Sequence, residues 1–283
     1  MVVIECDKEY DDEDLKHLKN IELDMFNDFI NFCDKHDLNY NIFAGSALGT
    51  VRHKGFIPWD DEIDIAMLRQ DYEKFLKLFK EYGNHDKYEL VNWHTQFGVD
   101  ENLYTHMTFI CLKNTSLYPN YKIGIYLDLH VLDYVPNTKF KRFLYSKHMQ
   151  FNSFATTIFK DTYSSEKTQR FGHFIRVLFK IFHITPNFMA RLFTKRVLKY
   201  RPENSTHVSD DSYYFTKFFP KEYFNDLIKL EFENLEVKIP KEYDKILRMI
   251  YGDYMQLPPE EERVNHNGSD IDFGQYWHPP KFL

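Results

Sequence analysis

Residues 43–67 read FAGSALGTVRHKGFIPWDDEIDIAM, and this stretch decides which fold and which kind of site we expect. It opens with a small-residue turn, Gly45-Ser46, and continues with a basic triplet at residues 52–54. Acidic and apolar residues then alternate from Asp60 to Ile65. Phosphate-binding and metal-binding side chains therefore lie within one short stretch, and this combination indicates an enzyme.

The apolar pattern around this stretch predicts both helices and strands. Apolar side chains recur at three- and four-residue steps, as on the buried face of a helix, in residues 11–37 and 70–82. Strand-like runs fall at residues 40–44, 61–67, 88–93, 104–112 and 124–133. Residues 46–53 would form a short helix with Ser46 as its N-cap. We therefore expect an α/β (α+β) fold in which a mixed sheet is flanked by helices.

The chain becomes mainly helical further on, which predicts a catalytic core over residues 1–138 and a helical portion over residues 139–283. Residues 167–201 contain nine Lys or Arg and no acidic residue, interleaved with large apolar side chains. Pro186 suits the first turn of a helix and would divide this segment into two helices. Its basic face is either simply solvated or a surface that attracts substrate phosphates or an anionic membrane.

The composition excludes several classes of protein. A net charge of −7 is unlike the basic excess of a nucleic-acid binder, so no nucleic-acid partner is expected. Three widely spaced cysteines without a Cys-x-x-Cys pair fit a reducing compartment, and neither a disulfide scaffold nor a zinc cluster. The sequence shows neither a signal-peptide pattern nor an apolar run long enough to span a membrane, so we expect a soluble cytoplasmic protein.

Carboxylates on two of the predicted strands could form a metal site. Glu62 and Asp64 would project from the same face of one strand, with Asp60 just before them. Asp128 would add a third carboxylate from a later strand. Oxygen donors of this kind suit Mg²⁺, and Mn²⁺ could replace it. A calcium-binding EF-hand is excluded, because its pattern requires Gly at the position of Ile65.

A second group of residues could bind phosphate. Gly45 permits close backbone approach and the helix after it offers free N–H groups, so Gly45 and Ser46 are candidates. Arg52 is suited to bidentate contact with phosphate oxygens, and His53 or Lys54 could share that task. The chain contains neither the Gly-Lys-Ser/Thr of a Walker loop nor a Gly-x-Gly-x-x-Gly motif, which excludes a P-loop and disfavours a dinucleotide fold.

These motifs resemble those of a known family. The order Gly-Ser, a carboxylate pair and a later carboxylate is similar to that of the nucleotidyltransferase fold. Residues 44–65 resemble the signature of the LicD family, phosphocholine-type transferases related to the fukutin group of ribitol-phosphate transferases. The resemblance continues in YLDLHVLDYVP at residues 126–136 and in YGDYMQLPP at residues 251–259, followed by Arg263 and His266.

The resemblance implies a nucleotidyltransferase-like fold and a Mg²⁺-dependent reaction, the transfer of phosphocholine from CDP-choline to a sugar hydroxyl with release of CMP. The acceptor would be a glycan or lipid-linked glycan, a precursor of lipopolysaccharide, teichoic acid or capsule. The protein would act in the cytoplasm, in peripheral contact with the anionic inner face of the membrane.

The resemblance also implies roles for individual residues. Glu62 and Asp64 would be metal ligands, although the family has Asp at the position of Glu62, so Asp60 with Glu62 stays an alternative pair. Asp128 would be the third ligand or the general base for the acceptor hydroxyl. Arg52 would stabilise charge in the transition state. The donor would be held by Gly45, Ser46, His53, Lys54, Arg263 and His266.

Three alternatives stay open. The group transferred could be ribitol-, glycerol- or ethanolamine-phosphate, because the aromatic cage that choline requires cannot be located among so many aromatic residues. A nucleotidyltransferase that uses a nucleoside triphosphate would need the same carboxylates, but the family-specific RHKGFIPW segment at residues 52–59 disfavours it. A non-catalytic binding protein is disfavoured because every candidate carboxylate is retained.

Overall fold

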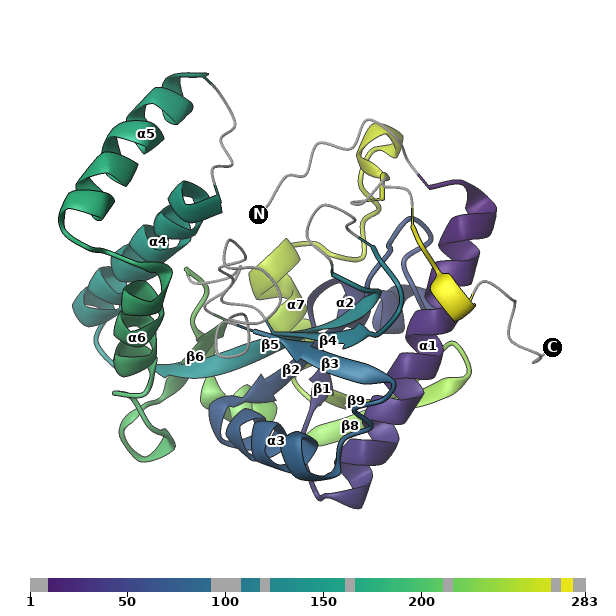
Figure 1. The fold of residues 1–283 in the computed structure, drawn as a ribbon. Helices are drawn as coiled ribbons and strands as arrows, with labels where there is room; N and C mark the ends of the chain where they lie inside the picture. Colours follow the sequence, from purple (N-terminus) through teal and green to yellow (C-terminus); the bar gives the residue numbers. More distant parts are fainter. Residues whose placement is uncertain are drawn as a thin grey trace. The chain divides into compact units, whose positions relative to one another are not determined.

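The computed structural model describes residues 10–92, 108–117, 123–160, 166–210, 216–265 and 271–276, which belong to two compact units. The larger unit contains the described residues up to Val91, those from Thr108 to Val131, and those from Tyr223 onward. The smaller unit contains Asn92 and the described residues from Leu132 to Glu222. The structure contains a mixed sheet with helices beside it (Figure 1). This confirms the predicted α/β class with a mixed sheet and flanking helices. The domain boundary expected at residue 138 stays a prediction.

The sheet of the larger unit places the two carboxylate-bearing strands side by side. Its hydrogen-bonded order is β1 (Asn41–Ile42), β2 (Asp64–Leu68), β5 (Tyr126–Val135), β4 (Thr108–Leu112) and β3 (Tyr88–Val91). In the smaller unit, the end of β5 pairs with β6 (His207–Asp210), which pairs with β7 (Phe219–Pro220). Because β2 neighbours β5, Asp64 and Asp128 come from adjacent strands although they are far apart in the sequence.

Two helices lie beside this sheet (Figure 1) and contact each other through aromatic side chains. Helix α1 (Asp12–Lys35) begins where Asp11 accepts hydrogen bonds from the N–H groups of Glu13 and Asp14, at 3.0 and 2.8 Å. Helix α3 (Arg69–Tyr82) contacts it, since the rings of Phe29 and Phe75 lie 5.7 Å apart. Both helices lie where the apolar periodicity predicts them.

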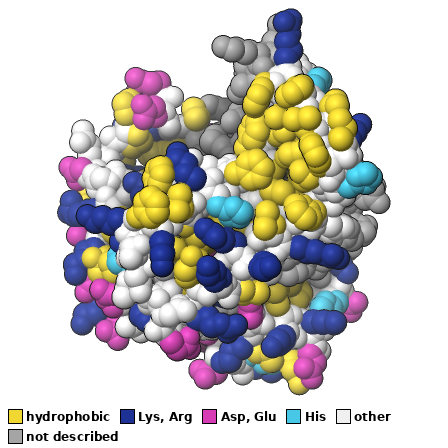
Figure 2. All heavy atoms as spheres, turned by 90° about the vertical axis from the view of Figure 1, so that its left-hand side faces the viewer, with side chains coloured by type: hydrophobic (Ala, Val, Ile, Leu, Met, Phe, Trp, Pro, Cys, Tyr) yellow, Lys and Arg dark blue, Asp and Glu magenta, His cyan; other side chains and the backbone are white. Residues whose placement is uncertain are grey.

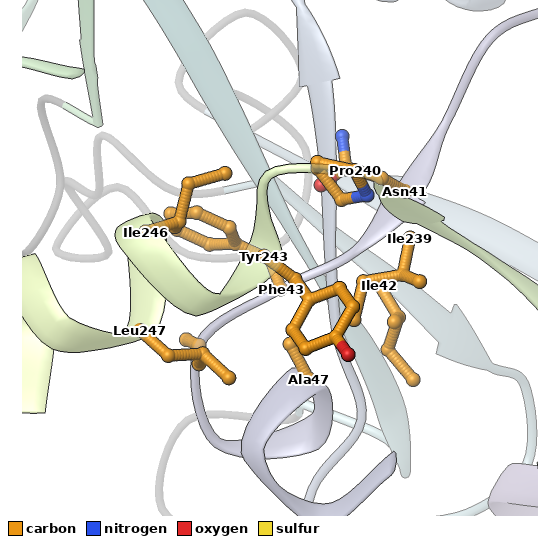
Figure 3. A pocket seen from close by; sticks show the side chains of 10 residues that line it. Asn41, Ile42, Phe43, Ala47, Ile239, Pro240, Tyr243, Ile246 and Leu247 are labelled. Atoms are coloured by element: carbon orange, nitrogen blue, oxygen red, sulfur yellow. The ribbon is translucent and has the colours of Figure 1, made fainter. Parts of the chain in front are cut away.

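The end of the chain folds back onto its first motif. Strands β8 (Leu227–Phe232) and β9 (Leu235–Pro240) form a hairpin, followed by helix α7 (Tyr243–Tyr251). Figure 3 shows side chains of β9 and α7 meeting those of β1 and helix α2 (Ala44–His53) around a cavity of about 10 Å³. A cavity this small holds one water molecule at most, so it is a packing seam and not a substrate site.

Two local predictions for the first motif are wrong. Helix α2 begins at Ala44 with Phe43 as a cap that offers no side-chain hydrogen bond, so Ser46 lies inside the helix and is not its N-cap. The Ser46 hydroxyl instead accepts a hydrogen bond from the N–H of Asp64, at 2.8 Å. Strand β2 begins only at Asp64, so Glu62 precedes the strand. The Ser46–Asp64 contact joins residues eighteen positions apart, so local sequence does not reveal it.

The smaller unit contains three helices among its described residues: α4 (Lys139–Lys160), α5 (Glu166–Ile181) and α6 (Pro186–Val197). The predicted helix break is confirmed, because Pro186 opens α6 and the hydroxyl of Thr185 accepts a hydrogen bond from the N–H of Phe188, at 3.1 Å. Over the described part of the chain, we find no helix that combines the length and the apolar character needed to cross a bilayer.

Gly49 in α2 gives a test of this packing. A Cβ at this position would lie 2.4 Å from the carbonyl oxygen of Gly55 and 3.1 Å from the backbone nitrogen of Ile57. We expect Gly49→Ala to lower the free energy of unfolding by about 1–3 kcal/mol, because the backbone of the loop must move. Urea denaturation measures this, with the exposed Lys77→Ala as control. Intrinsic helix propensity alone predicts the opposite sign, a gain of about 1 kcal/mol, and that result would show that the contact is not tight.

Candidate active site

Asp64 is held at the N-terminus of α2. Its Oδ2 accepts hydrogen bonds from the N–H groups of Gly45 at 2.9 Å and Ser46 at 3.4 Å, and its side chain is buried. These N–H groups are among those that a helix leaves without partners in its first turn. The positive end of the helix dipole also favours a negative charge at this position. The Gly-Ser turn therefore fixes the orientation of a carboxylate.

Asp128 and His130 approach Asp64 from β5. The N–H of Asp128 donates to the carbonyl oxygen of Ile63 at 3.0 Å, which sets the register of β5 beside the start of β2. The Nε2 atom of His130 lies 3.1 Å from Oδ1 of Asp64 and 3.7 Å from Oδ2 of Asp128. All three side chains are buried, and each offers one ligand atom within 4.8 Å of the others. Such a cluster could hold a divalent cation.

Gly45 leaves room between two carboxylates. A Cβ at Gly45 would lie 3.1 Å from Oδ2 of Asp60 and 3.2 Å from Oδ2 of Asp64. Asp60 is therefore drawn up to the same turn as Asp64, although it precedes β2 by several residues. Both contacts would be closer than is usual for a Cβ atom, so a larger residue at position 45 would require the Asp60 or Asp64 carboxylate to shift by a few tenths of an ångström.

The pKa of Glu62 is affected by the neighbouring carboxylates. Burial raises the pKa of Glu62 well above its ordinary value, and the carboxylates of Asp64 and Asp128 raise it further. The hydroxyl of Tyr126 lies 3.5 Å from Oε2 of Glu62. Repulsion of this kind would be relieved by a bound cation, which favours the ionised form of each carboxylate. The predicted ligand Glu62 thus lies within electrostatic range of both aspartates even though it is outside the strand.

The donor atoms fit a hard divalent cation. The oxygens of Asp64 and Asp128, with Glu62 or Asp60 beside them, match the preference of Mg²⁺ for carboxylates. An imidazole ligand would shift the preference towards Mn²⁺ or Zn²⁺. In the observed arrangement, however, Nε2 of His130 faces Asp64 at hydrogen-bonding distance, so His130 can instead orient that carboxylate.

Two arginines, one from the first motif and one from the end of the chain, act on each other electrostatically. The guanidinium of Arg52 donates to the carbonyl oxygen of Tyr254 at 2.8 Å and, through Nε, to His53 at 2.9 Å. Burial lowers the pKa of Arg52, and the charge of Arg263 lowers it further. The guanidinium of Arg263 lies over the ring of Trp59, 5.6 Å from its centroid. Two like charges that repel each other would be stabilised by an anion such as a phosphate.

Two other predicted phosphate-binding residues, His53 and Lys54, have different surroundings. Burial and the charge of Arg52 lower the pKa of His53, which favours its neutral form. Lys54 ends α2 in the left-handed region, with a φ of 60°, and its side chain is 76% exposed. It pairs with Glu231 at 3.5 Å, at the surface and away from the buried carboxylates. His266 lies outside the described residues.

Sequence reasoning missed the residues that fix the loop between the two halves of the motif. The ammonium group of Lys19 donates to the carbonyl oxygens of Ile57 and Pro58, at 3.3 and 2.9 Å. From the other side, Glu233 accepts a hydrogen bond from the N–H of Phe56 at 3.1 Å. Neither residue has a sequence signal, because both act from distant parts of the chain. His130 could have been found, since it lies two positions after Asp128 on the same face of a strand.

Comparison with known proteins identifies the domain that contains this cluster. Residues 37–163 match the family described as "LicD/FKTN/FKRP, nucleotidyltransferase domain". They form a LicD-family domain. The resemblance predicted from the motifs is therefore confirmed, and the LicD-family domain includes the whole cluster of Asp64, Asp128 and His130.

Individual relatives extend the match. The protein is 29% identical over 261 residues to the lipopolysaccharide cholinephosphotransferase LicD of Haemophilus influenzae, covering 89% of this chain and 96% of that protein. Uncharacterised proteins of Rickettsia typhi and Rickettsia prowazekii share 37% identity over 60 residues and 38% over 58 residues. These shorter matches cover 20% and 19% of this chain, and 19% and 22% of the Rickettsia proteins. The similarity to the Haemophilus protein thus extends well beyond the LicD-family domain.

Buried Glu22 on α1 gives a pH-dependent prediction. Burial raises the pKa of Glu22, and the charges of Asp61 and Glu62 raise it further. The unfolded chain loses this proton at a lower pH than the folded chain, so wild-type stability falls as the pH rises from the ordinary value through the raised one. The glutamine side chain of Glu22→Gln does not titrate, so this variant does not undergo the same loss. The Tm of Glu22→Gln minus the Tm of wild type should therefore increase from about pH 5 to about pH 8.

Differential scanning calorimetry with a chelator present measures this difference. The matched control is Glu203→Gln, which removes a carboxylate at an exposed position. A Glu22→Gln difference that stayed flat across the same range would show that Glu22 titrates normally in the folded protein.

Proposed function

We propose that the protein transfers phosphocholine from CDP-choline to a sugar hydroxyl of a lipopolysaccharide precursor or a similar cell-surface glycan, releasing CMP. The observation that carries this proposal is the buried cluster of Asp64, Asp128 and His130 at the N-terminus of α2, inside a LicD-family domain. The name of the Haemophilus relative, whose sequence this chain matches over 96% of its length, supports choline as the substituent and lipopolysaccharide as the acceptor class.

Asp64 and Asp128 would hold the cation, with Glu62 or Asp60 completing the set. We propose Mg²⁺, with Mn²⁺ as a substitute, because most of the donors are carboxylate oxygens. When bound, the cation would offset the negative charge of the donor's diphosphate. His130 would hold Asp64 in its ligating orientation through the 3.1 Å contact.

The remaining residues would bind the donor and activate the acceptor. Arg52 and Arg263 would bind phosphate oxygens, because an anion relieves the repulsion between the two guanidinium groups. Asp128 stays the candidate for accepting the proton of the sugar hydroxyl, if it is not itself a ligand. Gly45 and Ser46 already direct their N–H groups at Asp64, so we assign them to positioning that carboxylate, and their contact with phosphate stays a prediction.

The proposed substrates suggest where the protein acts. A CDP-activated donor is a cytoplasmic metabolite class, and an acceptor built on a lipid carrier would be presented at the membrane. We therefore propose a cytoplasmic enzyme in peripheral contact with the inner face of the membrane. Teichoic-acid and capsule precursors are acceptors of the same chemical class, and they stay predictions.

Activity measurements with metal-site variants test this proposal. With CDP-choline, Mg²⁺ and a glycan acceptor, Asp64→Ala and Asp128→Ala should each lower kcat/KM by at least about 100-fold, because each removes a ligand. Asp86→Asn, at an exposed position, is the matched control, and circular dichroism checks that each variant is folded. Wild-type rates in a folded Asp64→Ala would overturn the site.

The choice of donor decides between the alternatives. Parallel assays with CDP-ribitol, CDP-glycerol and CDP-ethanolamine test this choice. A higher rate with one of these donors would replace phosphocholine as the proposed transferred group. Release of pyrophosphate from a nucleoside triphosphate would favour a nucleotidyltransferase. Absence of turnover with all of these substrates, together with a lack of Mg²⁺ binding, would favour a binding protein.

Binding of the cation itself can be measured without turnover. Mg²⁺ should raise the Tm of the wild-type protein, and Asp128→Asn should remove this shift. If His130 orients Asp64, His130→Gln should weaken both Mg²⁺ and Mn²⁺ binding by about 10–100-fold. If His130 is a ligand, its loss should weaken Mn²⁺ binding much more than Mg²⁺ binding, because Mn²⁺ accepts imidazole more readily. Isothermal titration calorimetry separates the two outcomes.

A further inference from the structure

Helix α5 of the smaller unit is apolar on two sides. One side is part of a core cluster, in which Phe179 packs with residues such as Ile158 and Met189. The other side is open, since Phe174 is 59% exposed and Ile181 is 62% exposed. Helices of soluble proteins normally carry polar residues on the face away from the core, so this second apolar face needs an explanation.

The exposed side chains form one surface across three helices, which we call the apolar face (Figure 2). On α4 and α5 they recur at the three- and four-residue steps of a helix stripe. The rings of Phe154 and Phe171 lie 6.1 Å apart, so the stripes of these two helices join. The apolar face consists of Phe140, Phe143, Leu144, Phe151, Phe154, Phe171, Phe174, Val177, Ile181, Phe182, Phe188 and Leu192.

All charged side chains that the structure describes on these three helices are basic. Helices α4 and α6 contain no Asp or Glu, and the single acidic residue of α5 is Glu166 at its first position. Lys and Arg side chains border part of the hydrophobic patch in Figure 2. Lys147 places its ammonium group 5.5 Å from the ring centroid of Phe143. The exposed basic residues of the three helices include Lys139, Lys141, Lys147, Arg170, Lys180, Arg191 and Lys195.

We infer that the apolar face inserts into the surface of an anionic membrane. Aromatic and aliphatic side chains on a basic helix enter the boundary between headgroups and acyl chains, while Lys and Arg remain at the headgroups. Each basic residue near an anionic leaflet adds about 1 kcal/mol of attraction. Contiguous exposed patches of this kind are uncommon on monomeric soluble proteins and mark interaction surfaces.

Charge complementarity favours an anionic membrane over a second copy of the chain as the partner of the apolar face. Pairing two apolar faces would bring two basic surroundings together, and like charges in contact are unfavourable. An anionic leaflet instead neutralises the basic residues while it covers the apolar ones. The inference deepens the proposed function by describing how a lipid-linked acceptor could be reached, but it depends on the apolar face alone.

Vesicle flotation with the full-length protein tests the inference. We expect binding to vesicles that contain phosphatidylglycerol and weak binding to pure phosphatidylcholine, with part of the binding resistant to salt because it is hydrophobic. Phe174→Ser combined with Ile181→Ser should lower the partition coefficient at least about tenfold, including at high salt. Arg170→Gln combined with Lys180→Gln should lower it mainly at low salt. The exposed Tyr82→Ser, outside the apolar face, is the matched control.

Several outcomes would overturn the inference. One is absence of binding to anionic vesicles, and another is binding unchanged by Phe174→Ser with Ile181→Ser. A concentration-dependent dimer that this double variant abolishes, without vesicle binding, would assign the face to a second copy. Turnover of CDP-choline with a water-soluble acceptor should be the same in wild type and the double variant. Failure of the membrane inference therefore differs from failure of the proposed function, in which this turnover would be absent from wild type.

Discussion

The Oδ2 atom of Asp64 accepts hydrogen bonds from the first N–H groups of α2, while its Oδ1 atom lies 3.1 Å from His130. This one carboxylate therefore joins a helix terminus to two neighbouring strands of the sheet. Asp64 is also the first residue of β2, and Gly45 leaves room beside its own backbone for the carboxylates of Asp60 and Asp64. Burying a carboxylate is unfavourable unless it is compensated, and here hydrogen bonds, the helix dipole and a site suited to a cation provide the compensation.

The segment before Asp64 is kept in place by distant parts of the chain. Lys19 binds its carbonyl groups from α1, and Glu233 binds the N–H of Phe56 from the turn of the β8–β9 hairpin. Packing of β9 and α7 on β1 and α2 brings Tyr254 to Arg52. Three regions far apart in the sequence thus support one site, and two of them lie outside residues 37–163.

Much of the fold could be predicted because its causes are local. The helix of residues 12–35 follows from apolar periodicity and the capping of Asp11, and the break at Pro186 follows from its fixed backbone angle. Predictions were wrong where the structure depends on contacts between distant parts of the chain. Ser46 bonds to the N–H of Asp64 instead of capping a helix, and Glu62 falls outside the strand because pairing begins at Asp64.

By itself the sequence determined the family and the chemical types at the site, since motif residues such as Asp64, Asp128 and Arg52 carry these in their identity and spacing. The tertiary structure decided which of these groups meet. Strand order places β5 beside β2, so His130 joins the two aspartates, while Lys54 points to the surface. It also decided that α5 has an apolar face left open, because periodicity records which side chains align on a helix but not whether anything covers them.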